Sequence, residues 1–174
     1  MRRLLLLRHA KSDRPPGMPD HDRPLNRRGR DDAPIIGTYL AHNALIPDRV
    51  LCSTAERTRE TWDLVAGQLP KHPQVEFEER LYEAGSPAIL NLVRATPQKA
   101  HSLLVIGHNP GMHQCALTLI ASGDVEARER LHEKFPTTAL AVIDFALDDW
   151  DKLHARSGRL DRFITPRQLS AEPD

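Results

Sequence analysis

The feature of this sequence that most constrains its fold is the run of four leucines at residues 4–7, which is followed immediately by Arg8 and His9. A short uninterrupted apolar run is typical of a strand in a parallel sheet, because helices cover both faces of such a strand. Ligands of open α/β sheets bind at the carboxyl ends of the strands. The run therefore predicts a central strand over residues 3–8 that presents Arg8 and His9 at the binding edge of a sheet.

Apolar strands and amphipathic helices alternate along the rest of the chain, which predicts an α/β fold with helices on both faces of a mostly parallel sheet. Residues 11–25 are polar and contain four prolines and a glycine, so they predict a loop. Asn26 is suited to cap a helix that runs to about His42. We expect further strands over 49–52, 75–79, 102–106, 139–145 and 160–164, of which 75–79 lies near an edge of the sheet. We expect further helices over 55–69, 86–95, 110–121 and 124–134, with Ser86 as the cap of the second and Pro87 in its first turn. Residues 170–174 are expected to form a frayed tail.

The composition limits the class of protein. At 174 residues the chain has the size of a single domain, residues 1–174, that can bury a sizeable core. It contains 24 basic and 24 acidic residues, often interleaved, which argues against a general surface for nucleic acid or for an anionic membrane. The leucine run is too short for an export signal or a membrane span. We therefore expect a cytoplasmic protein.

The two cysteines, Cys52 and Cys115, do not have the spacing of a metal-binding motif. A disulfide between them is not expected in a reducing compartment. Cys52 directly precedes Ser53 and could be read as a nucleophile. We favour the other interpretation, in which Cys52 is a small buried apolar side chain at the end of a strand.

Arg8 and His9 suit phosphoryl transfer, although such a pair could equally be a structural feature of a strand end. A neutral imidazole can attack phosphorus and form a phosphohistidine, and a guanidinium can bind two phosphate oxygens at once. We expect the other ring nitrogen of His9 to donate to a backbone carbonyl. His108 lies in the tight turn Gly107–Gly111 after another apolar strand, so the functional interpretation is favoured there too.

Arg57 lies in the first turn of a predicted helix that follows a strand. Backbone N–H groups and the positive end of the helix dipole favour an anion at such a place. Arg57 alone could be a solvated helix arginine, but we assign that role to Arg59, which is followed by Glu60. Arg57 is therefore our second candidate arginine for binding phosphate.

Other polar residues follow strand-like segments and could complete the site. Glu83 comes after Leu81 and Tyr82 and is a candidate proton donor. Lys11 and Ser12 follow His9 and could add phosphate contacts. The remaining histidines are expected to be surface or structural residues: His21, His42, His72, His101, His113, His132 and His154.

Five segments together resemble the histidine phosphatase superfamily, and more closely its short SixA-type phosphohistidine phosphatases. The segments occur in the family's order between Leu4 and about Ile120, and their combination is highly specific although no single segment is. They are Leu7–Asp13 (LRHAKSD), Arg23–Gly29 (RPLNRRG), Ser53–Thr58 (STAERT), Leu81–Ala84 (LYEA) and Gly107–Gly111 (GHNPG).

This resemblance implies a three-layer α/β/α sandwich like that of phosphoglycerate mutases, with no metal and no cofactor. It implies that His9 is the nucleophile that becomes phosphorylated. It also implies that Arg8, Arg57 and His108 form the phosphate pocket and that Glu83 takes the place of the family's acid.

The sequence departs from much of the superfamily at two places. Ala10 replaces the glycine that follows Arg-His, although the SixA-like branch often has alanine there. Residues 57–81 are too few for the inserted cap with which mutases and sugar phosphatases enclose small substrates. Because a site without a cap is open, it can admit a phosphorylated side chain of another protein. We therefore expect a phosphohistidine phosphatase that acts on a signalling or phosphotransfer protein.

Other functions compete with this prediction. A small-molecule phosphomonoesterase or a phosphoglycerate mutase-like enzyme would share the nucleophile, and an open site also tolerates small phosphate esters. A metal-dependent hydrolase is disfavoured because the sequence has no His-Glu-x-x-His run and no paired Asp cluster. A catalytically silent phosphate-binding module is disfavoured because Arg8, His9, Arg57 and His108 are all intact.

Overall fold

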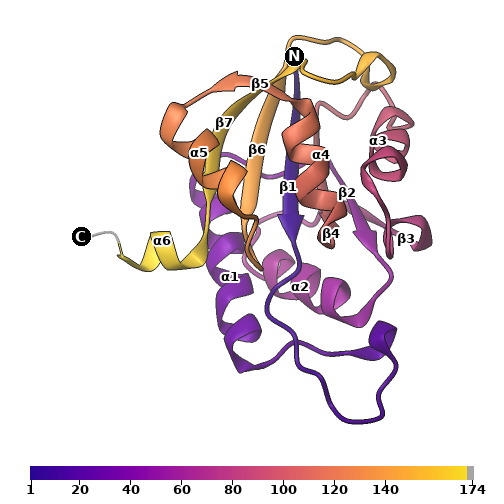
Figure 1. The fold of residues 1–174 in the computed structure, drawn as a ribbon, viewed down its shortest axis with the longest axis vertical. Coiled ribbons are helices and arrows are strands. Elements are labelled where there is room, and N and C mark those ends of the chain that lie inside the picture. Colours follow the sequence, from indigo (N-terminus) through magenta and orange to yellow (C-terminus); the bar gives the residue numbers. More distant parts are fainter. Residues whose placement is uncertain (172–174) are drawn as a thin grey trace.

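A computed structural model describes residues 1–171, and its strands form one seven-stranded sheet in the order β3-β2-β4-β1-β6-β7-β5 (Figure 1). The strands are β1 (Arg2–Arg8), β2 (Arg49–Ser53), β3 (Gln74–Glu78), β4 (Ser102–Gly107), β5 (Ile120–Gly123), β6 (Leu140–Phe145) and β7 (Gly158–Ile164). Strands β1 to β4 are parallel, as are β5 and β7, whereas β6 is antiparallel to both β1 and β7. Of the seven described strands β6 alone runs against the others, so the predicted mostly parallel sheet is confirmed.

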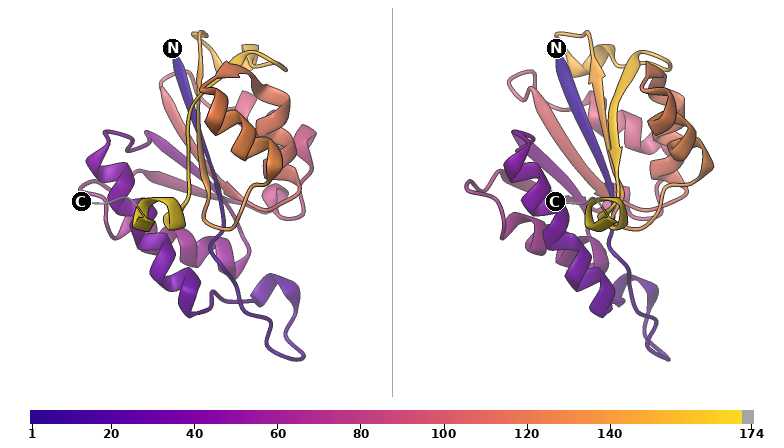
Figure 2. Two further views of the ribbon diagram at one scale, coloured as in Figure 1. Left: turned by 60° about the vertical axis from the view of Figure 1, so that its left-hand side comes forward. Right: turned by 90° about the vertical axis from the view of Figure 1, so that its left-hand side faces the viewer.

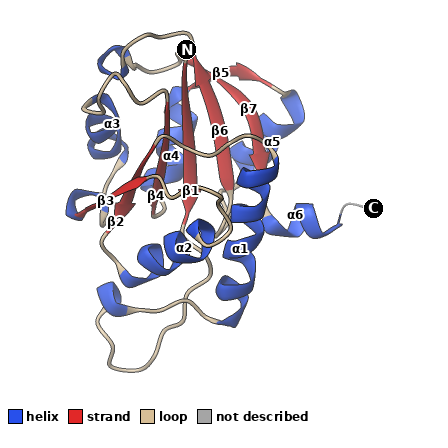
Figure 3. Ribbon diagram, turned by 180° about the vertical axis from the view of Figure 1, so that it is seen from behind, coloured by secondary structure: helices blue, strands red, loops and turns tan. Residues whose placement is uncertain are grey.

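Helices cover both faces of the sheet and make three layers (Figure 2). One layer contains α1 and α2, and the layer on the opposite face contains α3, α4 and α5, as the secondary-structure colouring of Figure 3 also shows. The helices are α1 (Arg27–His42), α2 (Glu56–Ala66), α3 (Ser86–Arg94), α4 (Gly111–Leu119), α5 (Val125–Glu133) and α6 (Pro166–Ala171), with short 3-10 turns η1 (Asp20–Asp22), η2 (Glu79–Leu81) and η3 (Trp150–Lys152).

The leucine run forms the centre of β1, and all four of its side chains are fully buried. Because side chains of a strand alternate between its faces, Leu4 and Leu6 pack in the core beneath α3, α4 and α5. Leu5 and Leu7 pack in the opposite core, beneath α1 and α2. Each buried leucine contributes about 1.5–3 kcal/mol to the free energy of folding. The run therefore contributes side chains to both cores, and the predicted central strand is confirmed.

The carboxyl ends of β1, β2 and β4 lie together at one edge of the sheet. Arg8 at the end of β1 is paired with Gly107 at the end of β4, and Cys52 near the end of β2 is paired with Ile106. Residues 11–25 extend beyond this edge (Figure 1). At Gly29 in α1 a Cβ atom would lie 2.1 Å from the carbonyl oxygen of Lys11, so only glycine lets the helix approach the start of this loop.

Several predicted boundaries were wrong because pairing and packing decide them. The cap of α3 is Gly85 rather than Ser86, whose side chain is buried within the helix. The helix predicted over 110–121 ends at Leu119, because Ile120 begins β5, which pairs with β7. Ser170 belongs to α6 rather than to a frayed tail, and residues 172–174 lie outside the described residues.

Both cysteines are buried and unpaired, and burial raises the pKa of each thiol to about 12. A thiol with such a pKa forms very little thiolate, which is the reactive form. The interpretation of Cys52 as a small buried side chain is therefore confirmed. No helix within residues 1–171 is both long enough and apolar enough to cross a membrane.

Candidate active site

A cavity of about 500 Å³ opens at the carboxyl edge of β1, β2 and β4. It brings together six of the seven residues that the sequence analysis singled out, and it leaves Glu83 outside. Its walls are formed by Arg8, His9, Lys11, Ser12, Asp13, Arg14, Asp20, Arg23, Arg57, His108, Asn109 and Thr137. The cavity therefore lies where the parallel strands were expected to deliver Arg8 and His9.

The ring of His9 is held by the backbone that follows it. Its Nδ1 atom lies 2.7 Å from the carbonyl oxygen of Ala10 and donates to it, which leaves the lone pair on Nε2. The N–H of Ala10 donates to Oγ1 of Thr61, and that hydroxyl donates to the carbonyl oxygen of Arg57. Helix α2 thus holds the backbone at Ala10, the residue whose carbonyl group orients the ring of His9, and the expected backbone carbonyl is that of Ala10.

His9 remains neutral because it is buried among positive groups. Only 7% of the residue is exposed. Burial lowers the pKa of its imidazole to about 3, and nearby His108, Arg57 and Arg8 lower it further while the bond to the Ala10 carbonyl opposes them. An unprotonated imidazole is the form that can act as a nucleophile.

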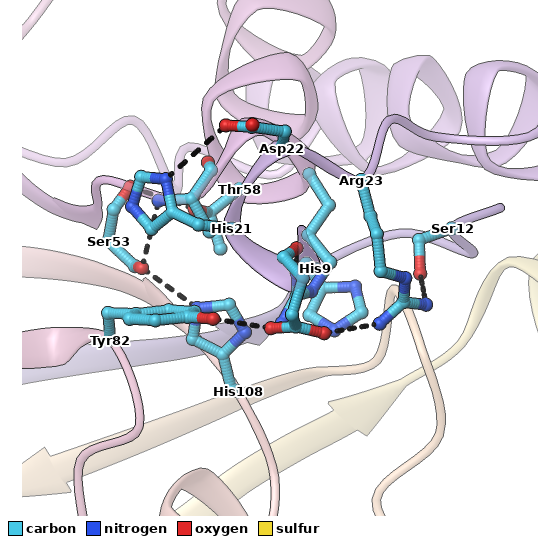
Figure 4. Close-up of polar contacts among 12 residues, drawn as sticks. His9, Ser12, His21, Asp22, Arg23, Ser53, Thr58, Tyr82 and His108 are labelled. Carbon is cyan, nitrogen blue, oxygen red and sulfur yellow. Dashed lines mark hydrogen bonds and ion pairs between the residues drawn. The ribbon is translucent and has the colours of Figure 1, made fainter. Parts of the chain in front are cut away.

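His108 is the partner of His9 across the cavity, with 5.2 Å between the ring centroids (Figure 4). Its Nε2 atom lies 2.8 Å from Oγ of Ser53, which also accepts from the N–H of Ala55. Because Oγ of Ser53 already accepts from Ala55, we assign the hydroxyl proton of Ser53 to the bond with Nε2, and His108 then carries its own proton on Nδ1. Burial, and then the charge of Arg57, lower the pKa of His108 to about 4.

The two arginines that line the cavity each keep a donor atom without a partner. Arg8 donates through Nη1 to the carbonyl oxygen of Phe135, and Arg57 donates through both Nη atoms to Asp20. The Nε atoms of both arginines are buried without a partner, as is Nδ1 of His108. Buried donors are rarely left unpaired in folded proteins, and each such group costs about 1–3 kcal/mol. Three unpaired N–H groups beside His9 therefore suit an anion with several acceptor oxygens.

The remaining predicted residues occupy different places. Lys11 is exposed at the rim of the cavity, and Oγ of Ser12 accepts from Nη2 of Arg23 at 2.6 Å. Glu83 is exposed, has a positive φ of 58° and does not line the cavity. Its role as an acid stays a prediction.

Arg59 is not a solvated residue, which corrects our expectation. Its Nε atom donates to the carbonyl oxygen of Thr54 at 3.0 Å, and its guanidinium lies 4.1 Å from the centre of the Phe77 ring. The residue is half-buried because β3 lies beside the start of α2 and provides that ring. Arg59 does not line the cavity, so the distinction between Arg57 and Arg59 as candidate phosphate ligands stands.

The sequence analysis gave no role to Asp20, Arg23 and Asn109, which also line the cavity. Arg23 and Asn109 belong to segments that carried the family resemblance, and membership in those segments is the sequence signal that could have identified them as site residues. Asp20 lies in a proline-rich loop in which no local pattern distinguishes it from Asp13 or Asp22. Within residues 1–171, no three His, Cys, Asp or Glu side chains gather in a way that could hold a metal ion.

We predict that both cavity histidines stay neutral between about pH 5 and pH 8 in the free protein. Their pKa values of about 3 and 4 lie below the ordinary 6.5, so the unfolded chain binds more protons than the folded protein as the pH falls below about 6.5. Stability is therefore retained above that pH and decreases below it. An NMR titration of the imidazole signals, assigned with His9 and His108 variants, measures both values. A midpoint near 6.5 for either ring would contradict the electrostatics described above.

Comparisons with known proteins show which family the chain resembles. The model of the histidine phosphatase superfamily (branch 1) matches residues 4–86. An uncharacterized protein of Mycobacterium leprae is 37% identical over 166 residues, which cover 92% of this chain and 100% of the relative.

Two solved structures are similar over nearly the whole chain, and both are described as candidate phosphohistidine phosphatases of the SixA type. The protein from Nakamurella multipartitia is 31% identical, with a TM-score of 0.82 over 95% of this chain and 96% of that one. The protein from Agrobacterium tumefaciens is 32% identical, with a TM-score of 0.79 over 95% and 99% of the two chains. The chain therefore belongs to the histidine phosphatase superfamily, and both its fold and its sequence are SixA-like.

Proposed function

We propose that this phosphatase removes phosphoryl groups from phosphohistidine on a signalling or phosphotransfer protein, without a metal or a cofactor. In the first step Nε2 of His9 attacks phosphorus, the P–N bond of the substrate breaks, and the leaving imidazole takes a proton. In the second step water attacks the phosphorylated His9, its P–N bond breaks, and inorganic phosphate is released. Each step transfers one phosphoryl group and needs no oxidant or reductant.

The observation that supports this proposal best is the set of unpaired donors around a neutral His9. Arg8 Nε, Arg57 Nε and His108 Nδ1 are buried, and none has a partner in the described structure. They can donate to the equatorial oxygens of a phosphoryl group, whose charge is redistributed in the transition state. The guanidinium groups of Arg8 and Arg57 supply the positive charge that a metal ion supplies in other phosphatases, and neutral His108 adds a hydrogen-bond donor.

The shape of the site favours a substrate presented by another macromolecule. Between Arg57 and Leu81 the chain forms only α2, the edge strand β3 and the short turn η2. No inserted domain covers the cavity in this part of the chain. A phosphorylated side chain can therefore enter while the rest of the partner stays outside. The SixA-like relatives bear names that agree with a phosphohistidine substrate.

The substrate proposal predicts how the protein tolerates loss of Glu83. An alkoxide leaving group needs a proton as it departs, and a positioned acid contributes about 10²–10⁴-fold to the rate. The imidazole of phosphohistidine takes a proton readily from solvent. We expect Glu83→Gln to keep most activity on a phosphohistidine protein but to lose at least about tenfold more on an alkyl phosphate ester. The ratio of kcat/KM values for the two substrates, measured for both proteins in chelating buffer, tests this.

Three results of that experiment are informative in different ways. An unchanged ratio would remove Glu83 from the acid role. A wild-type preference for the ester would overturn the phosphohistidine assignment. Activity that disappears in chelator and returns with a divalent ion would overturn the proposal that arginines supply the charge.

A further inference from the structure

The carboxylate of Asp20 connects three side chains at one wall of the cavity. Nη1 of Arg23 donates to its Oδ1 at 2.9 Å, and Nη2 of Arg57 donates to its Oδ2 at 3.1 Å. The hydroxyl of Tyr82 donates to the same Oδ2 atom. The three donors come from different segments of the chain, so Asp20 joins the loop, α2 and the turn after η2.

Asp20 uses one particular edge of the Arg57 guanidinium. Nη1 of Arg57 donates to the backbone carbonyl oxygen of Asp20 at 2.8 Å, and Nη2 donates to its carboxylate. A guanidinium has a second bidentate edge, which consists of Nε and the other hydrogen of the adjacent Nη. Nε of Arg57 is buried without a partner. The edge that Asp20 leaves free is therefore the edge that can grip two phosphoryl oxygens.

Arg23 supports Asp20 and has no donor atom left without a contact. Its Nε donates to the carbonyl oxygen of Asp13 at 2.9 Å, its Nη2 to Oγ of Ser12 and its Nη1 to Asp20. Arg23 is buried, so these bonds hold the start and the middle of the loop together. This differs from Arg8 and Arg57, each of which keeps a free Nε.

Tyr82 supports Asp20 from the opposite side. Its ring lies edge-on to His108, with 5.6 Å between centroids, and edge-on to His21 at 4.8 Å. Its hydrogen bond to Asp20 is the largest cause that holds the pKa of that carboxyl well below its usual range, and the two arginines act in the same direction. Asp20 is therefore ionised at neutral pH, with its charge shared between two guanidinium groups.

We propose that Asp20 is a positioning residue that orients Arg57 for the phosphoryl group, and that Arg23 and Tyr82 hold Asp20 in place. This proposal rests on the proposed function, in which Arg57 binds phosphate. The alternative is that the carboxylate competes with phosphate for Arg57 and leaves when phosphate binds. The two possibilities predict opposite changes in phosphate affinity when Asp20 is removed, because loss of a positioning group weakens phosphate binding whereas loss of a competitor strengthens it.

The deciding experiment measures the Kd of inorganic phosphate by calorimetry for the wild type and Asp20→Ala. We expect Asp20→Ala to weaken binding on the order of tenfold, as for a lost hydrogen bond between charged groups. Asp22→Ala is the matched control, because it removes an exposed carboxylate from the same turn and leaves the Kd unchanged. Equal or tighter phosphate binding by Asp20→Ala would overturn the proposal.

A double-mutant cycle with Arg57→Ala separates positioning from a general effect on the loop. If Asp20 acts through Arg57, Asp20→Ala changes the Kd by less than about twofold once Arg57 is absent. A full tenfold effect in the Arg57→Ala background would show that Asp20 acts in another way and would overturn the proposal.

Tyr82→Phe provides a variant that keeps the aromatic ring in case Asp20→Ala does not fold. We expect it to weaken phosphate binding about threefold, while Tyr39→Phe on α1, which loses only a contact with Arg162, leaves binding unchanged. No effect of Tyr82→Phe would remove Tyr82 from the network. Phosphoenzyme formation by the wild type is measured alongside, because its absence would count against the proposed function rather than against Asp20.

Discussion

His9→Ala should form no phosphoenzyme and should lose at least roughly 10³-fold in kcat, because the group that accepts the phosphoryl in the first step is gone. The wild type, quenched rapidly after mixing with a phosphohistidine protein that carries labelled phosphate, should retain label on the protein. Acid should remove that label and base should not, which is the behaviour of a phosphoramidate. The amount of stable label per protein is the measurement.

His113→Ala is a suitable control for this variant. Like His9, His113 has a ring that contacts a backbone carbonyl, that of Leu131, but His113 is half-buried and does not line the cavity. Its removal should leave labelling and kcat close to those of the wild type. Thermal unfolding of both variants checks that the loss in His9→Ala is chemical. Equal labelling of His9→Ala and the wild type would refute the assignment of the nucleophile.

Arg57→Ala should have the second largest effect, a decrease of about 10²–10³-fold in kcat/KM, or about 2.7–4 kcal/mol. The reason is that Arg57 lines the cavity, is 6% exposed and keeps an unpaired Nε. Water that fills the space of the Arg57 side chain in the variant does not replace its positive charge. The phosphoryl group in the transition state therefore loses a hydrogen-bond donor. Steady-state kinetics on the phosphohistidine protein provide the measurement.

Arg59→Ala tests whether this effect is specific to the cavity. Arg59 lies two residues further along α2, contacts Thr54 and Phe77 and does not line the cavity. We expect its loss to lower the free energy of unfolding by about 1 kcal/mol, through the lost cation–π contact and hydrogen bond. We expect kcat/KM to change by less than about threefold. A larger kinetic effect for Arg59→Ala than for Arg57→Ala would contradict the geometry of α2 described above.

The central part of the site could be predicted from the sequence because it depends on local patterns. The leucine run is typical of a buried strand in a parallel sheet, and the ligands of such sheets bind at the carboxyl ends of the strands. The same reasoning applies to the strand before His108 and to the turn before Arg57. Three short segments therefore predicted one cavity, and the structure places Arg8, His9, Arg57 and His108 around it.

The tertiary structure alone decided which side chains hold those residues in position. Asp20 lies in a loop without periodicity, and its contacts with Arg23, Arg57 and Tyr82 span between 3 and 62 positions of the sequence. Contacts between distant segments also explain two other differences from the sequence predictions. Ile120, which was expected to be helical, begins β5 because it pairs with β7, and Arg59 is half-buried because the ring of Phe77 packs against its guanidinium. Periodicity reports whether one face of an element is buried, but not which distant element covers it. For this reason the sequence predicted six of the seven described strands, together with a nucleophile and phosphate ligands for the cavity, whereas only the packed chain decided the strand β5, how Arg57 is oriented and that Glu83 stays outside the cavity.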